Sequence, residues 1–90
     1  LRYIRQICDA VNEVPKTVFA KGAFFAREAM GKLNCETIGL DLDMGISESR
    51  KMIGENKTLQ GNLDPAALYG NHDQVRTATI QMMAADILRI

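Results

Sequence analysis

Thr17-Val18-Phe19-Ala20 is the first of three short stretches that decide the fold; the other two are Thr37-Ile38-Gly39-Leu40 and Thr58-Leu59-Gln60-Gly61. β-Branched, aromatic and aliphatic residues dominate these stretches, which is typical of buried β-strands. Helical patterns precede the first stretch and follow each of the three. Strands separated by helices run parallel, because each crossover returns the chain to the same edge of the sheet. The sequence therefore predicts an α/β domain with three parallel βα units preceded by a helix.

Helices are predicted on both sides of the first strand. Residues 1–12 place apolar side chains at helical spacing, namely Leu1, Ile4, Ile7, Cys8 and Val11. Gly22 is expected to end the strand, and a second helix is predicted over about residues 23–32. The expected core positions of that helix are Phe25, Ala29, Met30 and Leu33.

Capping residues mark the later helices. Ser47 is predicted to cap a short helix after the second strand. Asp64 stands before Pro65, which is the order of an N-cap followed by Pro at the first helical position. Asn71 is predicted to begin the last helix, and Gln74 three residues later fits a capping box.

Length and charge limit the possible functions. The 90 residues allow one small domain, and eleven basic residues balance eleven acidic ones. This balance argues against a nucleic-acid-binding protein, and no apolar run is long enough to cross a bilayer. Two widely spaced cysteines, Cys8 and Cys35, indicate buried thiols in a reducing, cytoplasmic setting. Because Leu1 is not a methionine, we expect the chain to begin within a longer protein.

The carboxyl ends of parallel strands are where sites gather in α/β folds. The candidate residues there are Lys21, Asp41, Asp43, Asn62 and Asp64. The three aspartates could form a Mg²⁺ site, but helix capping, loop amide binding and solvation explain them better. Lys21 either meets an anionic ligand or faces solvent. Periodicity alone leaves both a flavodoxin-like sheet and part of a (β/α)₈ barrel open.

Several motifs resemble the uroporphyrinogen decarboxylase family. The most specific is Thr58-Leu59-Gln60-Gly61-Asn62-Leu63-Asp64-Pro65, followed by Ala67-Leu68-Tyr69. Val14-Pro15, residues 17–22 and Ile38-Gly39-Leu40-Asp41 support it, in the order of the family's C-terminal half. The likeness covers residues 1 to about 83 and implies a single partial (β/α)₈ (TIM) barrel domain over residues 1–90.

The chain departs from the family pattern in three places. Leu42 stands where the family usually has Trp, and Ala66 where it often has Cys. Residues 84–90 diverge from the family, which there turns towards another strand.

The resemblance implies a cofactor-independent carboxy-lyase of haem biosynthesis. Such enzymes convert uroporphyrinogen III to coproporphyrinogen III by removing four acetate carboxyls, and they act as cytoplasmic homodimers without metal, nucleic acid or membrane. The family's catalytic aspartate, arginines, tyrosine, serine and histidine all map outside residues 1–90. We therefore assign no catalytic residue here and keep Lys21, Asp41, Asn62 and Asp64 only as weak substrate-binding candidates at the barrel mouth. We expect the chain alone to be inactive and marginally stable or prone to aggregation, because open sheet edges expose unpaired backbone groups.

Two other functions remain open at this point. Corrinoid-linked methyltransferases are distantly similar, but they use a zinc site with thiolate and imidazole ligands. Cys8, Cys35 and His72 are scattered in this sequence, with no close ligand pair. The second alternative is a non-catalytic half-barrel, either a stand-alone interaction module or a pseudoenzyme, which self-association through the open sheet edges would support.

Overall fold

A computed structural model describes residues 1–21 and 24–87 of the chain. The predicted strand end at Gly22, the start of the second helix at Ala23 and residues 88–90 lie outside the described part. The elements in chain order are α1 (Arg2–Ala10), β1 (Thr17–Phe19), the 3₁₀-helix η1 (Phe24–Ala26), α2 (Arg27–Met30), β2 (Thr37–Gly39), α3 (Ile46–Ile53), β3 (Thr58–Gln60), the 3₁₀-helix η2 (Pro65–Tyr69) and α4 (His72–Ile87).

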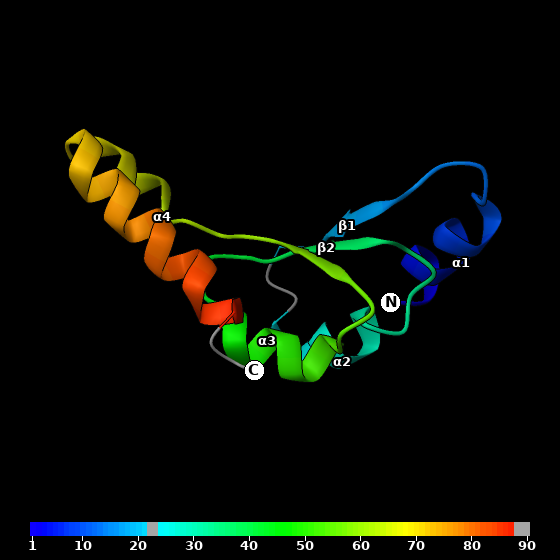
Figure 1. Ribbon diagram of the computed structural model, residues 1–90. Helices are drawn as coiled ribbons and strands as arrows, with labels where there is room; N and C mark the ends of the chain where they lie inside the picture. Colours follow the sequence, from blue (N-terminus) through cyan, green and yellow to red (C-terminus); the bar gives the residue numbers. More distant parts are fainter. Residues whose placement is uncertain (22–23, 88–90) are drawn as a thin grey trace.

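The three strands form one sheet in the order β1-β2-β3, and both neighbouring pairs are parallel. The predicted α/β class and parallel βα units are therefore confirmed. In the central register row, Val18 pairs with Ile38 and Ile38 pairs with Leu59. Figure 1 shows α2 and α3 lying together on one face of this sheet.

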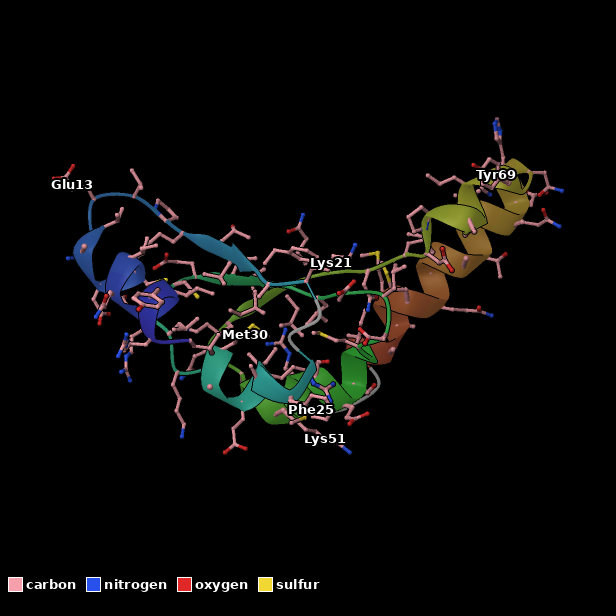
Figure 2. All side chains as sticks on the ribbon, turned by 180° about the vertical axis from the view of Figure 1, so that it is seen from behind. Glu13, Lys21, Phe25, Met30, Lys51 and Tyr69 are labelled. Atoms are coloured by element: carbon pink, nitrogen blue, oxygen red, sulfur yellow. The ribbon has the colours of Figure 1, made fainter. Side chains whose placement is uncertain are left out.

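The hydrophobic core lies between the sheet and these helices. Ile38 is fully buried there, and Val18 and Leu59 from the same register row pack against the core. Figure 2 shows Met30 rising from α2 toward the sheet, and its side chain is fully buried. Because side chains alternate along a strand, the neighbouring rows point to the opposite face.

The opposite face carries a row made of Phe19, Gly39 and Gln60, which we call the open-face row. A second row on that face contains Thr17, Thr37 and Thr58. The described helices leave this face uncovered (Figure 1). Phe19 is 56% exposed, so a large apolar side chain lies on this uncovered face.

Two lysines hold the loops at the amino ends of the strands. Lys16 Nζ donates to the carbonyl of Cys8 at 2.6 Å, and Lys57 Nζ donates to the carbonyls of Leu33 and Cys35, each at 2.6 Å. Both thiols are buried, as predicted. Burial raises the pKa of the Cys35 thiol, although the nearby Lys57 ammonium opposes this shift. Cys35 therefore carries less thiolate at neutral pH than a free cysteine does.

The apolar stripe predicted for α1 is only partly buried. Cys8 is buried and Ile4 is half-buried, whereas Leu1, Ile7 and Val11 are exposed. The reason is the position of α1 beside the amino end of β1 (Figure 1), where it meets the rest of the chain along a narrow strip.

The second predicted helix is shorter and rotated relative to the prediction. A 3₁₀ turn precedes the four residues of α2, and Phe25 is 95% exposed on it (Figure 2). Ala29 is also exposed, so two of the predicted core positions are wrong. Arg27 is 1% exposed in their place, because Ser49 Oγ on α3 accepts a hydrogen bond from its guanidinium at 2.9 Å.

The cap predicted at Ser47 is also wrong. Gly45 is the N-cap of α3, and no side chain caps that helix. Ser47 lies within α3, where its hydroxyl donates to the carbonyl of Ala85 on α4 at 2.5 Å. The hydroxyl that was expected to begin one helix therefore joins two helices.

The capping box before α4 is confirmed. Asn71 Oδ1 accepts from the backbone N–H of Gln74 at 2.8 Å, and Gln74 Oε1 accepts from the backbone N–H of Asn71 at 2.9 Å. This reciprocal pair satisfies two donors that a helix start leaves unpaired.

Candidate functional site

The candidate residues follow the carboxyl ends of the three strands. Lys21 follows β1, Asp41 follows β2, and Asn62 and Asp64 follow β3. Lys21 and Asp64 are exposed, whereas Asp41 and Asn62 are half-buried. The four residues share one edge of the sheet, as the parallel topology requires.

The side chain of Asn62 connects two of these loops. Its Nδ2 donates to the carbonyl of Asp41 at 2.8 Å and to the carbonyl of Met44 at 2.5 Å. The carboxylate of Asp41 accepts from the backbone N–H of Leu42 at 2.9 Å, which confirms the predicted loop-amide bond. Asn62 and Asp41 are therefore brought together to fix the loop after β2, and both amide hydrogens of Asn62 are used.

Asp64 has a capping role. Its Oδ1 accepts from the backbone N–H of Ala66 at 2.9 Å, which confirms the predicted N-cap, although the capped element is the 3₁₀-helix η2. Asp43 is exposed in the loop after β2. Within residues 1–21 and 24–87, no group of three His, Cys, Asp or Glu side chains is placed to hold a metal ion.

An Asn62→Ala variant is expected to loosen the loop after β2. The two lost hydrogen bonds are each worth about 1 kcal/mol, so amide hydrogen exchange at residues 41–45 should accelerate roughly tenfold or more. Exchange at Met44 is the clearest readout, because its N–H donates to the Asp41 carbonyl at 3.1 Å. The control is Asn56→Ala, which changes an exposed residue of the loop after α3. Equal exchange in the two variants contradicts this role for Asn62.

The open-face row was missed as a candidate. Phe19, Gly39 and Gln60, together with Leu40 and Gly61, line a shallow cavity of about 300 Å³ at the carboxyl ends of the strands. The signal that could have found it is the alternation of side chains along each predicted strand. Along each strand, a side chain that faces the helices is followed by one that faces the open side of the sheet. Once the register of the three strands is known, the residues of the open-face row can be identified.

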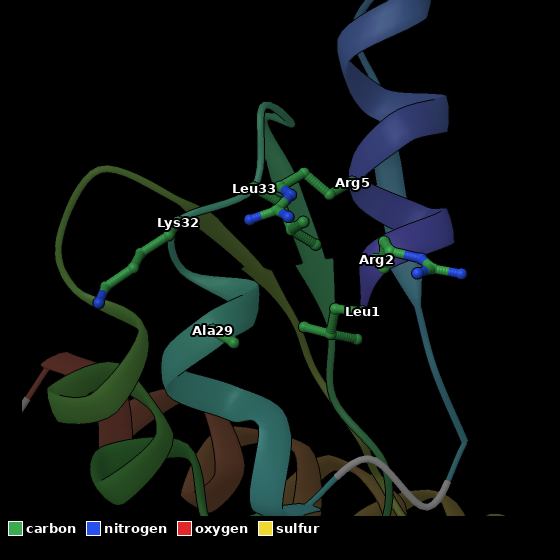
Figure 3. Close-up of a pocket in the computed structure, with 6 residues that line it drawn as sticks. All are labelled: Leu1, Arg2, Arg5, Ala29, Lys32 and Leu33. Atoms are coloured by element: carbon green, nitrogen blue, oxygen red, sulfur yellow. The ribbon is translucent and has the colours of Figure 1, made fainter.

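A second cavity lies between α1 and α2. It measures about 350 Å³ and is lined by Leu1, Arg2, Arg5, Ala29, Lys32 and Leu33. Figure 3 shows the charged ends of Arg2 and Lys32 pointing away from each other. The guanidinium of Arg2 stacks 4.8 Å from the ring centroid of Tyr3 and donates to its hydroxyl at 2.7 Å. Arg2 and Lys32 thus do not converge on one anion position.

Comparison of the sequence with models of known protein families identifies the family of this chain. The family model described as uroporphyrinogen decarboxylase (URO-D) matches residues 1–89. The chain belongs to the uroporphyrinogen decarboxylase family. The match runs to residue 89 and so includes most of residues 84–90, the segment that we expected to diverge from the family.

Curated members of the uroporphyrinogen decarboxylase family agree. The chain is 34% identical over 91 residues to the uroporphyrinogen decarboxylase of Shewanella pealeana, a match that covers 94% of this chain and 26% of that protein. It is 38% identical over 90 residues to that of Neisseria meningitidis serogroup C, covering 93% of this chain and 25% of that protein. The chain thus spans about a quarter of the length of the curated relatives it matches. Its three parallel strands are part of a TIM barrel, and the bare sheet face is the barrel's inner face.

Proposed function

We propose that these residues supply three βα units to a uroporphyrinogen decarboxylase, which converts uroporphyrinogen III to coproporphyrinogen III by removing four acetate carboxyls. The observation that carries the proposal is the family match over residues 1–89. The enzyme is a carboxy-lyase of porphyrin and haem biosynthesis and needs no metal or organic cofactor. In its reaction a pyrrole ring is protonated, CO₂ leaves while the cationic ring takes up the electron pair, and a proton completes the new methyl group.

The contribution of this chain is to shape one side of the barrel mouth. Asn62 fixes the loop after β2 through two carbonyls, and Asp64 caps the turn after β3. A preorganised carboxylate that stabilises the pyrrole cation is the family's electrostatic device, and its residue maps outside this chain.

Charge indicates that the substrate is anchored mainly by other segments. Among the candidate residues, Asp41, Asp43 and Asp64 are negative and only Lys21 is positive. A substrate with eight carboxylates is repelled by such a set. We propose that residues 1–90 alone do not catalyse decarboxylation.

The partners follow from the same proposal. The complete enzyme binds a porphyrinogen and works as a cytoplasmic homodimer, without nucleic acid or membrane. Over residues 1–21 and 24–87, the structure contains no helix with the length and apolar character to cross a bilayer.

The test is a segment exchange, in which residues 1–90 replace the matched quarter of the Neisseria meningitidis enzyme. We expect the exchanged enzyme to form coproporphyrinogen, and the 90-residue chain alone to form none. The matched control is the Neisseria meningitidis enzyme from which the same quarter has been deleted, and it should be inactive. The proposal is wrong if the exchanged enzyme folds without forming product, and the inactivity of the chain alone is wrong if that chain turns over substrate.

A further inference from the structure

We propose that the open-face row contacts the porphyrinogen directly, with the Phe19 ring packed on a pyrrole and the Gln60 amide donating a hydrogen bond to a substrate carboxylate. The inference rests on the proposed function and deepens it, because it names residues of this chain that recognise the substrate. None of them is among the candidates that the loops suggested.

The register places the row on the inner face. Phe19 pairs with Gly39 and Gly39 pairs with Gln60, one residue beyond the row of Val18, Ile38 and Leu59 that faces the helices. This row is the last one before the strands end. In TIM barrels the substrate lies at that end, whereas rows nearer the amino ends fill the barrel with packed side chains.

The side chains of Phe19 and Gln60 lie over Gly39 and partly fill the space that a side chain there would take. A Cβ built on Gly39 would lie 2.9 Å from Cδ1 of Phe19 and 3.5 Å from Oε1 of Gln60. The phenyl ring and the amide therefore occupy the space on either side of a residue that has no side chain. The cavity of about 300 Å³ opens above them.

The chemistry of the two side chains suits a tetrapyrrole bearing carboxylates. The exposed Phe19 ring offers an apolar surface for a pyrrole face, because aromatic rings pair favourably when stacked or set edge to face. The Gln60 side chain makes no hydrogen bond to any residue in the described part of the chain. When the barrel excludes water from this face, the amide needs a partner, and a substrate carboxylate supplies one.

A neutral amide also fits the charge of the site. Asp41, Asp43 and Asp64 already repel a polycarboxylate, so a fourth acidic residue in the open-face row would oppose binding further. The amide donors of Asn62 are committed to backbone carbonyls. Gln60 is therefore the side-chain amide at this edge that remains available to the substrate.

The experiment uses the exchanged enzyme with two substitutions in the row, Gln60→Glu and Phe19→Leu. We expect Gln60→Glu to raise KM for uroporphyrinogen about tenfold, with a larger effect at low salt, because a charged acceptor replaces a donor. Phe19→Leu should raise KM about threefold to tenfold. In both variants kcat should change less than KM, and Tm should stay close to that of the parent.

Matched controls are Gln6→Glu, on an exposed position of α1, and Phe25→Leu, on the exposed 3₁₀ turn. Both should leave KM unchanged. If Gln60→Glu and Phe19→Leu lower Tm while KM stays at the parent value, the row only packs the barrel and the inference is wrong.

A binding measurement separates this inference from the proposed function. Quenching of uroporphyrin fluorescence reports binding to the exchanged enzyme whether or not it turns over. An exchanged enzyme that binds uroporphyrin without decarboxylating uroporphyrinogen contradicts the proposed function. If Gln60→Glu then raises the Kd for uroporphyrin, the contact between the open-face row and the substrate is still supported. Binding that the row substitutions leave unchanged overturns the inference, and absence of binding overturns both.

Discussion

A Gly31→Ala variant of the 90-residue chain is expected to lose its helical circular dichroism without any denaturant. A Cβ on Gly31 would lie 2.2 Å from the carbonyl oxygen of Ile53 and 2.9 Å from its carbonyl carbon and Cα. All three atoms belong to the backbone, so the end of α2 and the end of α3 must move apart. Overpacking of this kind costs about 3 kcal/mol, a large share of the stability of a domain this small.

Backbone conformation does not account for that loss. Gly31 has φ −64° and ψ −16°, which alanine adopts readily, and alanine is the better helix former. The control is Gly45→Ala, because a Cβ there meets no atom within 4 Å. Gly45→Ala should keep the unfolding free energy within about 1 kcal/mol of the parent. Circular dichroism of both variants in buffer decides the matter, followed by urea titration of Gly45→Ala and the parent. A Gly31→Ala chain as helical as the parent contradicts the packing of α2 on α3.

The second large effect is expected for Ser49→Ala, which should lower the unfolding free energy by about 2 kcal/mol. Ser49 is fully buried, and its Oγ accepts a 2.9 Å hydrogen bond from Nη1 of Arg27, which is 1% exposed. The substitution removes a hydrogen bond from a charged group that has been taken out of water. Such a loss exceeds that of a neutral, exposed pair.

Two further variants separate the contribution of this hydrogen bond to stability from the contributions of the charges around it. Glu48→Gln weakens the 3.2 Å ion pair with Arg27, but the Glu48 side chain is 65% exposed, so the loss should stay below about 1 kcal/mol. Adding Arg27→Met to Ser49→Ala removes the desolvated charge and should recover part of the stability. Urea unfolding gives all three values, and a double variant less stable than Ser49→Ala contradicts the assignment.

The regular parts of the fold could be predicted because their signals are local. Each strand can be recognised from four consecutive residues, and the capping box of Asn71 and Gln74 lies within one helical turn. Parallel pairing then follows from the order of helices and strands. The signal for Asp64 was equally local, since an acidic residue directly before Pro65 predicts a cap.

The errors arise where a distant partner overrides local spacing. Phe25 fits the apolar spacing of a helix, but a buried bond between Arg27 and Ser49, 22 residues apart, turns the other face of the segment inward. Ser47 has the residue type of a cap, yet its hydroxyl donates a hydrogen bond to the carbonyl of Ala85 on another helix. Periodicity within one segment carries no information about such partners.

The candidate site was predictable only in part. The topology showed that Asp41 and Asn62 would share an edge of the sheet. It did not show that the Asn62 amide would bind the carbonyls of Asp41 and Met44, because those contacts depend on loop shape. Recognition of the open-face row additionally required the register, which short strands with little alternation in polarity specify weakly.

The central claim is that this chain is a parallel arc of a decarboxylase barrel whose inner face carries Phe19, Gly39 and Gln60. Nuclear Overhauser contacts between the strands of the 90-residue chain test it most directly. They should join Thr17, Thr37 and Thr58 at one end of the sheet and the open-face row at the other. Contacts that place residue 17 opposite residue 39 would show antiparallel pairing and contradict the claim.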